Sequence, residues 1–95
     1  MADNSIMTNI SAVQNYGKGL SDFAKQLQGK FKDLERATDA IGNIWNDDQF
    51  KKFHDEFKQN IKKSILEATT KMELQANYIK KIIELQRQIQ QTKNY

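Results

Sequence analysis

The chain has no cysteine and no proline, and only four of its 95 residues are glycine. Without cysteine, it has neither a disulfide framework nor the usual cysteine-based zinc site. Without proline and with so little glycine, it has few of the residues that make the tight turns of a β-sheet. These absences favour a fold made of a few long helices.

Long apolar runs are also absent. No stretch approaches the roughly 18 consecutive apolar residues that a membrane-spanning helix requires. The N-terminal sequence shows no basic segment followed by an apolar one, so we expect no cleavable signal peptide. If the protein leaves the cell, its export system must recognise a feature other than a signal peptide.

The residues that are present suit helices that share a core with a partner. Thirteen lysines and ten glutamines stand beside an apolar content of 38%. A chain of this length buries only a modest fraction of its surface when it folds alone. We therefore expect a single domain, residues 1–95, that associates with another chain.

In the first half of the chain, apolar residues recur at alternating spacings of four and three, the a/d pattern of a coiled-coil helix. We expect this helix to cover about residues 5–42, with its N-cap among Asp3, Asn4 and Ser5. The repeating positions are Ile6, Ile10, Val13, Gly17, Leu20, Ala24, Leu27, Phe31, Leu34, Thr38, Ile41 and Trp45.

The second half carries a wider apolar face, which is typical of a helix that packs against more than one neighbour. We expect this helix at about residues 47–90, followed by a frayed, glutamine-rich tail. Its repeat is Phe50, Phe53, Phe57, Ile61, Ser64, Ala68, Met72, Gln75, Ile79, Ile82, Gln86 and Ile89, and Ile65, Leu66, Leu74, Ile83 and Leu85 broaden it.

A turn at about residues 43–46 separates the two repeats. Gly42 suits the end of the first helix, and Asn46 suits the N-cap of the second. With that cap, Trp45 precedes the helix and Phe50 is its fourth residue, which is the spacing of a hydrophobic staple. The sequence therefore predicts that Trp45 closes the hairpin by packing over its tip.

The pattern predicts an all-α fold, a two-helix antiparallel hairpin. In such a thin rod, one side of each apolar repeat would remain exposed to solvent. We therefore expect two hairpins to dimerise into an elongated four-helix bundle. A hairpin that stays alone is the competing picture, and it would be prone to aggregation. The residues predicted to form the core and the dimer contact, called the predicted core residues below, are Leu20, Leu27, Phe31, Leu34, Ile41, Phe50, Phe57, Ile61, Met72, Ile79 and Ile82.

No group of residues indicates catalysis, metal binding or cofactor binding. His54 is the only histidine, and the residues three and four places from it are Phe50, Lys51, Phe57 and Lys58, none of which is a ligand. The phenylalanines recur at helical spacing, which favours a core over an aromatic ligand-binding box. We therefore expect no enzyme, no cofactor and no small-molecule substrate.

Positive charge gathers in the second half, where residues 46–95 hold ten basic and seven acidic side chains. Five of the basic residues fall within about 40° on a helical wheel. Such a stripe could bind nucleic acid or an anionic membrane, or it could be a solvated flank. Two arginines in all and no interleaved aromatic residues disfavour the first two partners. The stripe consists of Lys51, Lys58, Lys62, Lys80 and Arg87.

A hairpin of this size with a central tryptophan in its turn resembles the ESAT-six-like (WXG) family of bacterial type VII secretion. The resemblance is carried by Trp45, Asn46 and Asp47, then by Phe53 eight residues after the tryptophan and by Phe57. The family pattern is Trp-x-Gly, so this chain resembles its Trp-x-Asp variants. The C-terminal motif Tyr-x-x-x-Asp/Glu is absent, because the residue four places after Tyr78 is Ile82.

The resemblance implies a homodimer, or a heterodimer with a similar hairpin. It also implies a secreted substrate, or an adaptor that carries a larger effector, exported as a folded dimer from the cytoplasm. Trp45 would then be recognised by a secretion ATPase, or it would only stabilise the turn. The alternatives are a cytoplasmic coiled-coil scaffold or chaperone subunit, in which Trp45 is purely structural, and a helical protein that associates with nucleic acid.

Overall fold

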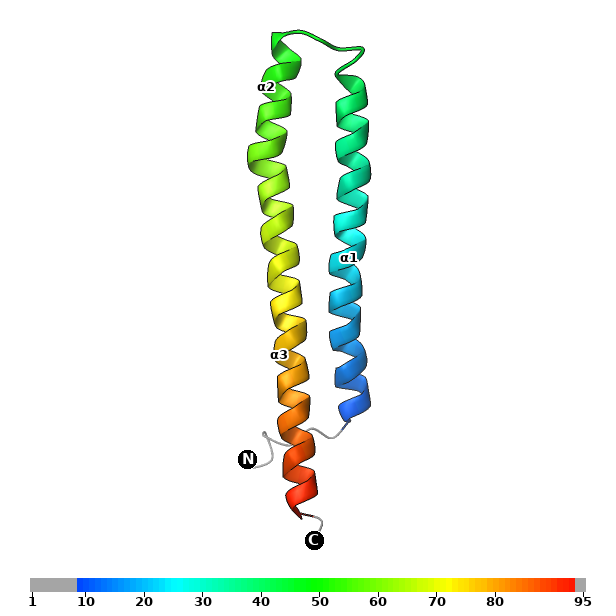
Figure 1. Ribbon diagram of the computed structural model, residues 1–95, viewed down its shortest axis with the longest axis vertical. Helices are drawn as coiled ribbons and strands as arrows, with labels where there is room; N and C mark the ends of the chain where they lie inside the picture. Colours follow the sequence, from blue (N-terminus) through cyan, green and yellow to red (C-terminus); the bar gives the residue numbers. More distant parts are fainter. Residues whose placement is uncertain (1–8, 94–95) are drawn as a thin grey trace.

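The computed structural model describes residues 9–93, which form an antiparallel helical hairpin (Figure 1). The first arm is α1 (Ile10–Ile41). The second arm is continuous and consists of α2 (Asp48–Glu56), the π-helical segment η2 (Phe57–Lys62) and α3 (Lys63–Lys93). The predicted all-α, two-helix antiparallel hairpin is confirmed. None of the described helices is both long and apolar enough to cross a membrane.

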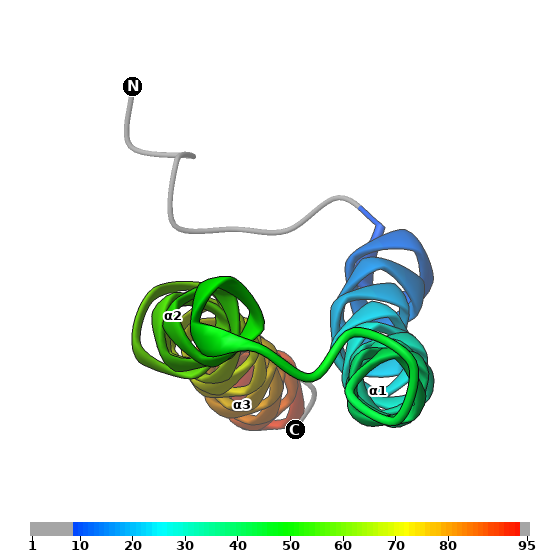
Figure 2. The ribbon, with the colours of Figure 1, turned by 90° about the horizontal axis from the view of Figure 1, so that it is seen from above.

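The hairpin is a thin rod in which the two arms lie side by side (Figure 2). Its dimensions are 72 × 20 × 17 Å, and its radius of gyration is 20.9 Å, whereas a compact chain of this length has one of about 12 Å. Its accessible surface is 7709 Å², against about 5700 Å² for a compact monomer of the same mass. Two helices alone therefore leave much of the chain in contact with water.

The observed helix ends differ from the predicted ones. Asn9 is the N-cap of α1, and its side-chain oxygen accepts a hydrogen bond of 3.0 Å from the backbone N–H of Ala12. The predicted caps, residues 3–5, lie outside the described residues. At the other end of the chain, α3 continues to Lys93, through most of the stretch where the sequence predicted fraying.

The N-cap of α2 is Asp47, so the prediction of Asn46 is wrong by one residue. The carboxylate of Asp47 accepts a hydrogen bond of 3.0 Å from the backbone N–H of Phe50. The reason lies in the turn, where the N–H of Trp45 still donates to the carbonyl of Ile41 at 2.7 Å. Because this hydrogen bond prolongs the last turn of α1, the second arm starts one residue later than the sequence suggested.

The interior of the hairpin is narrow and built largely from small residues. On α1, every seventh residue is buried: Gly17, Ala24, Phe31 and Thr38. The residues buried on the opposite arm are Phe57, Thr69, Ala76, Ile83 and Gln86. Small side chains at these positions allow the two backbones to approach closely, and the hydroxyls of both buried threonines donate to carbonyls of their own helices.

The π-helical segment changes which residues of the second arm face α1. The inward positions step by three or four, except that Phe57 and Lys62 are five apart across η2. A π-helical turn holds one residue more than an α-helical turn. Inward positions after η2 therefore come one residue later than a continuous α-helix predicts. For this reason Ile61, a predicted core residue, is 47% exposed, whereas Ile83 is buried.

The glycines of α1 give the first testable prediction. A Cβ atom added at Gly17 would lie 3.1 Å from Cγ2 of Ile79, whereas one added at Gly19 or Gly29 would meet nothing within 4 Å. We expect Gly19→Ala and Gly29→Ala each to raise the free energy of unfolding by about 0.5–1 kcal/mol, because alanine favours the helix. Gly17→Ala should lower it. Urea unfolding of the three variants measures this order, and a stabilising Gly17→Ala would contradict the close packing.

Candidate functional site

The tip of the hairpin is a cluster of aromatic rings at the end where α1 meets α2. The ring of Trp45 packs edge-on against Phe50 with 5.5 Å between centroids, and it lies 6.1 Å from Phe53. The contacts continue from Phe53 to Phe57, and Phe57 stacks on Phe31 of α1 at 5.4 Å with an interplanar angle of 9°. The predicted packing of Trp45 over the tip is confirmed, and the cluster links the turn to the interior.

The glycine at the end of α1 serves the same cluster. Gly42 is the C-cap, as predicted, but its φ of −59° is one that any residue can adopt. A Cβ atom there would lie 3.0 Å from the ring of Phe50 and 3.1 Å from the carbonyl oxygen of Asp39. Space, not backbone conformation, therefore explains why this position is glycine.

The cluster is only partly covered by the chain itself. Trp45 is 38% exposed, Phe53 is 44% exposed, and the neighbouring Ile44 is 85% exposed. Exposed apolar side chains at a turn are a common feature of contact sites. Of the predicted turn motif, Asn46 is also exposed, and Asp47 holds the start of α2.

The cap assignment gives a second prediction. Asp47→Ala removes the side-chain oxygen that accepts from the N–H of Phe50, and such losses cost about 1 kcal/mol. Asn46→Ala is the matched control, and we expect it to change the free energy of unfolding by less than half as much. Chemical denaturation followed by circular dichroism compares the two. An effect of the Asn46 variant as large as that of the Asp47 variant would contradict the observed cap.

Along the rod, the two sides of the hairpin differ in chemistry. Residues one place after and one place before a buried residue lie on opposite sides of it, because successive residues are about 100° apart. The places after the buried residues of α1 hold Lys18, Lys25, Lys32 and Asp39. The places before them hold Tyr16, Phe23, Lys30 and Ala37.

The apolar face lies on the side of Tyr16 and Phe23. Leu20, Leu27, Leu34 and Ile41 follow that side of α1 at intervals of seven residues, and the latter two are about half exposed. On the second arm, residues one or four places before an inward position, or three places after one, lie on the same side and continue it. We define the apolar face as Tyr16, Leu20, Phe23, Leu27, Leu34, Ile41, Ile61, Met72, Ile82 and Ile89.

The predicted core residues are divided between the interior and this face. Phe31 and Phe57 are buried inside the hairpin, and Phe50 and Ile79 are partly buried. The other predicted core residues belong to the apolar face and range from partly buried to about half exposed: Leu20, Leu27, Leu34, Ile41, Ile61, Met72 and Ile82. A single hairpin thus buries one half of the predicted repeat and leaves the other half open.

The opposite side, the polar face, carries the polar contacts between the two arms. The hydroxyl of Ser21 donates to Glu73 at 2.8 Å, and Lys62 pairs with Glu35 at 2.9 Å. His54 lies 3.3 Å from Asp39. We define the polar face on α1 by steps of three and four as Gln14, Lys18, Ser21, Lys25, Gln28, Lys32, Glu35 and Asp39, and on the second arm as His54, Lys58, Lys62, Glu73, Lys80, Glu84 and Arg87.

The contact between His54 and Asp39 was not predicted from the sequence. On the helix of His54 the residues three and four places away are two phenylalanines and two lysines, none of which can accept a hydrogen bond, and its partner Asp39 comes from the other arm. Among the described residues, no group of three or more histidine, aspartate and glutamate side chains could hold a metal ion. His54 therefore fastens the two arms near the tip.

No protein-family model matches the chain, and comparisons with curated proteins and with solved structures find no match either. The functional argument therefore rests on the hairpin, its aromatic tip and its apolar face.

Proposed function

We propose that this chain is a non-enzymatic substrate or adaptor of a type VII-like, ESAT-six-like secretion system and acts by pairing with a second helical hairpin. The observation that carries the proposal is the apolar face, which runs beside the interior for most of the length of a thin rod. The central Trp45 in the turn and Phe53 eight residues later support the resemblance to that family.

The partner that suits this face is another hairpin of similar length. In a four-helix bundle each helix contacts two neighbours. The interior residues Phe31 and Ile83 already serve one neighbour, and Leu34 and Ile82 of the apolar face would serve the other. A second copy of the chain, or a similar hairpin, would cover this face along its whole length.

The aromatic tip is the part of the proposed dimer that a larger partner would recognise. It lies at the end of the rod, away from the long sides along which two hairpins pack (Figure 1). Ile44 and Trp45 remain exposed there. A secretion ATPase or a larger effector would contact this end while the folded dimer leaves the cytoplasm.

Export of a Trp45→Ala variant tests the proposal. We expect the variant to remain helical and dimeric and to accumulate inside the cell, since it loses the largest side chain of the exposed tip. Immunoblots of the culture medium and of the cells measure the exported fraction, and Ile44→Ala provides a control at the same tip. Normal export of a folded Trp45→Ala protein would refute the recognition role.

A cytoplasmic coiled-coil scaffold or chaperone subunit is the second candidate. It is favoured by the contacts of Trp45 with Phe50 and Phe53, which give the tryptophan a structural role without any export partner. Finding the unmodified protein only inside cells that secrete other substrates of the same system would support this candidate.

A further inference from the structure

The polar face carries more positive charge than its own contacts use. Three of its acidic residues contact the other arm: Glu35 pairs with Lys62, Asp39 lies against His54, and Glu73 accepts from Ser21. Its other lysines and its arginine form no ion pair within residues 9–93: Lys18, Lys25, Lys32, Lys58, Lys80 and Arg87. Glu84 is the acidic residue that remains among them. With seven lysine and arginine side chains against four carboxylates, and with His54 neutral, the face has a net charge of about +3.

A groove between α1 and α3 opens at one end of this face. Its volume is about 190 Å³, and it is lined by Gly17, Ile79 and Ile83 together with Gln14, Lys18, Lys80, Glu84 and Arg87. The missing side chain of Gly17 brings α1 to within contact distance of Ile79 and leaves an apolar floor. A groove of this volume has room for one apolar side chain of a partner.

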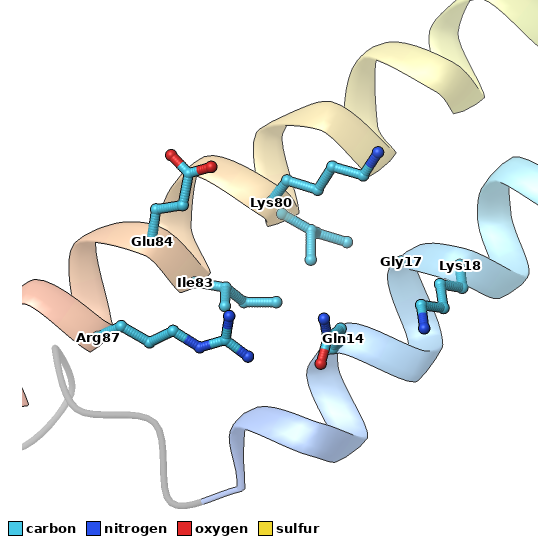
Figure 3. Close-up of a pocket in the computed structure, with 8 residues that line it drawn as sticks. Gln14, Gly17, Lys18, Lys80, Ile83, Glu84 and Arg87 are labelled. Atoms are coloured by element: carbon cyan, nitrogen blue, oxygen red, sulfur yellow. The ribbon is translucent and has the colours of Figure 1, made fainter.

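Figure 3 shows how the polar side chains lie around the groove. The guanidinium of Arg87 reaches from α3 toward Gln14 of α1, and Ile83 points into the gap between the two helices. The carboxylate of Glu84 points away from the gap. A carboxylate placed there would be attracted by the lysine and arginine side chains and could accept from the amide of Gln14. A cation would be repelled by the same charges.

We propose that the polar face, centred on the groove beside Gly17, binds an acidic segment of a partner protein that inserts one apolar side chain between α1 and α3. The apolar floor receives that side chain, and Lys18, Lys80 and Arg87 receive the carboxylates on either side of it. The face lies opposite the apolar face, so a hairpin partner and the acidic segment can bind together. For an adaptor, this segment would belong to its cargo.

Nucleic acid fits these observations less well. The face presents a single arginine and no aromatic side chain, so it offers neither an array of bidentate phosphate contacts nor a surface for base stacking. The apolar floor has no counterpart among the phosphates and sugars of a nucleic acid backbone. An acidic peptide with an apolar residue supplies both parts of the chemistry.

The test uses the full chain and a short synthetic peptide in which acidic residues flank a central leucine. We expect binding on the order of 10⁻⁴ M at low salt, weakened by added salt. Two control peptides carry lysines in place of the acidic residues, or serine in place of leucine, and both should bind at least tenfold more weakly. In nuclear magnetic resonance spectra the amide of Gly17 and the methyl groups of Ile83 should shift on binding.

Variants locate the site on the molecule. Lys18→Met with Arg87→Met should weaken binding of the leucine peptide about tenfold and leave helicity unchanged, since neither residue forms an ion pair with the described residues. The matched control is Lys71→Met with Lys81→Met, which removes the same charge from the side of α3 that carries Leu74 and Tyr78. Equal losses from the two pairs would overturn the proposal.

Other results would also overturn it. These are resonance shifts confined to the apolar face, equal binding of the leucine and serine peptides, or tighter binding of a single-stranded oligonucleotide than of the acidic peptide. Because the assay requires no secretion, a failure here leaves the export result for Trp45→Ala untouched. Loss of export with intact peptide binding would likewise leave this proposal standing.

Discussion

Leu34→Asp is expected to convert a dimer into a monomer and to leave the hairpin helical. Leu34 is 49% exposed on the apolar face, so a single hairpin tolerates a charge there. In a four-helix bundle the same carboxylate would be buried without a partner, which costs several kcal/mol. The dimer should therefore be weakened by more than about a hundredfold.

Light scattering at micromolar concentration measures this change directly. The unmodified chain should give twice its mass of 11.1 kDa, and the variant should give 11.1 kDa. Leu74→Asp is the matched control. Leu74 is 61% exposed, and it is two residues from the buried Ala76, which places it about 200° around the helix.

Three outcomes would contradict this arrangement in different ways. A dimeric Leu34→Asp protein would show that the apolar face of α1 is not the interface. Dissociation by Leu74→Asp alone would move the interface to the outer side of α3. A monomeric unmodified chain would mean that the face awaits a different hairpin, and mixing with candidate partners would then be the next measurement.

Phe57→Ala is expected to cause the largest loss of stability within the hairpin. Phe57 is among the few large apolar side chains that a single hairpin buries, and it stacks on Phe31 across the two arms. Truncating a buried phenylalanine costs about 3–5 kcal/mol, and a small domain has only about 5–15 kcal/mol in total. The variant should therefore lose much of its helicity well below the temperature at which the unmodified chain unfolds.

Phe53→Ala is the control for this prediction, because Phe53 belongs to the same cluster but is 44% exposed. We expect it to lower the free energy of unfolding by about 1 kcal/mol, in proportion to the smaller apolar area that it buries. Thermal and urea unfolding monitored by circular dichroism compare the two variants at matched protein concentration. Similar losses from both would show that the stacked pair is not the centre of the interior.

The sequence predicted the features that depend on local spacing. The repeat of threes and fours gave two long helices, and the group of glycine, asparagine and aspartate residues gave the turn between them. The contact of Trp45 with Phe50 also followed from spacing, even though the cap itself is Asp47. These features depend on residues close together in the chain, whose positions follow from the geometry of a helix.

The sequence could not show which half of each repeat a hairpin buries. On α1 the seven-residue series through Ala24 and Phe31 is inside, and the series through Leu27 and Leu34 is only partly covered. Both series are apolar at most positions, so composition does not distinguish them. The choice depends on how closely the two helices approach, and the small residues at Gly17 and Ala24 permit the closer contact.

Periodicity and composition determined the helical hairpin, its tip and the many apolar residues that it leaves exposed, because these depend on local hydrogen bonding and on total apolar area. Only the tertiary structure decided the register of the second arm and the separation of an apolar face from a polar one. The extra residue in η2 changes the facing of everything after Phe57. The contacts of Glu35 and Asp39 with the other arm join residues far apart in the chain. Such contacts depend on how two helices pack, and the spacing within either helix does not contain that information.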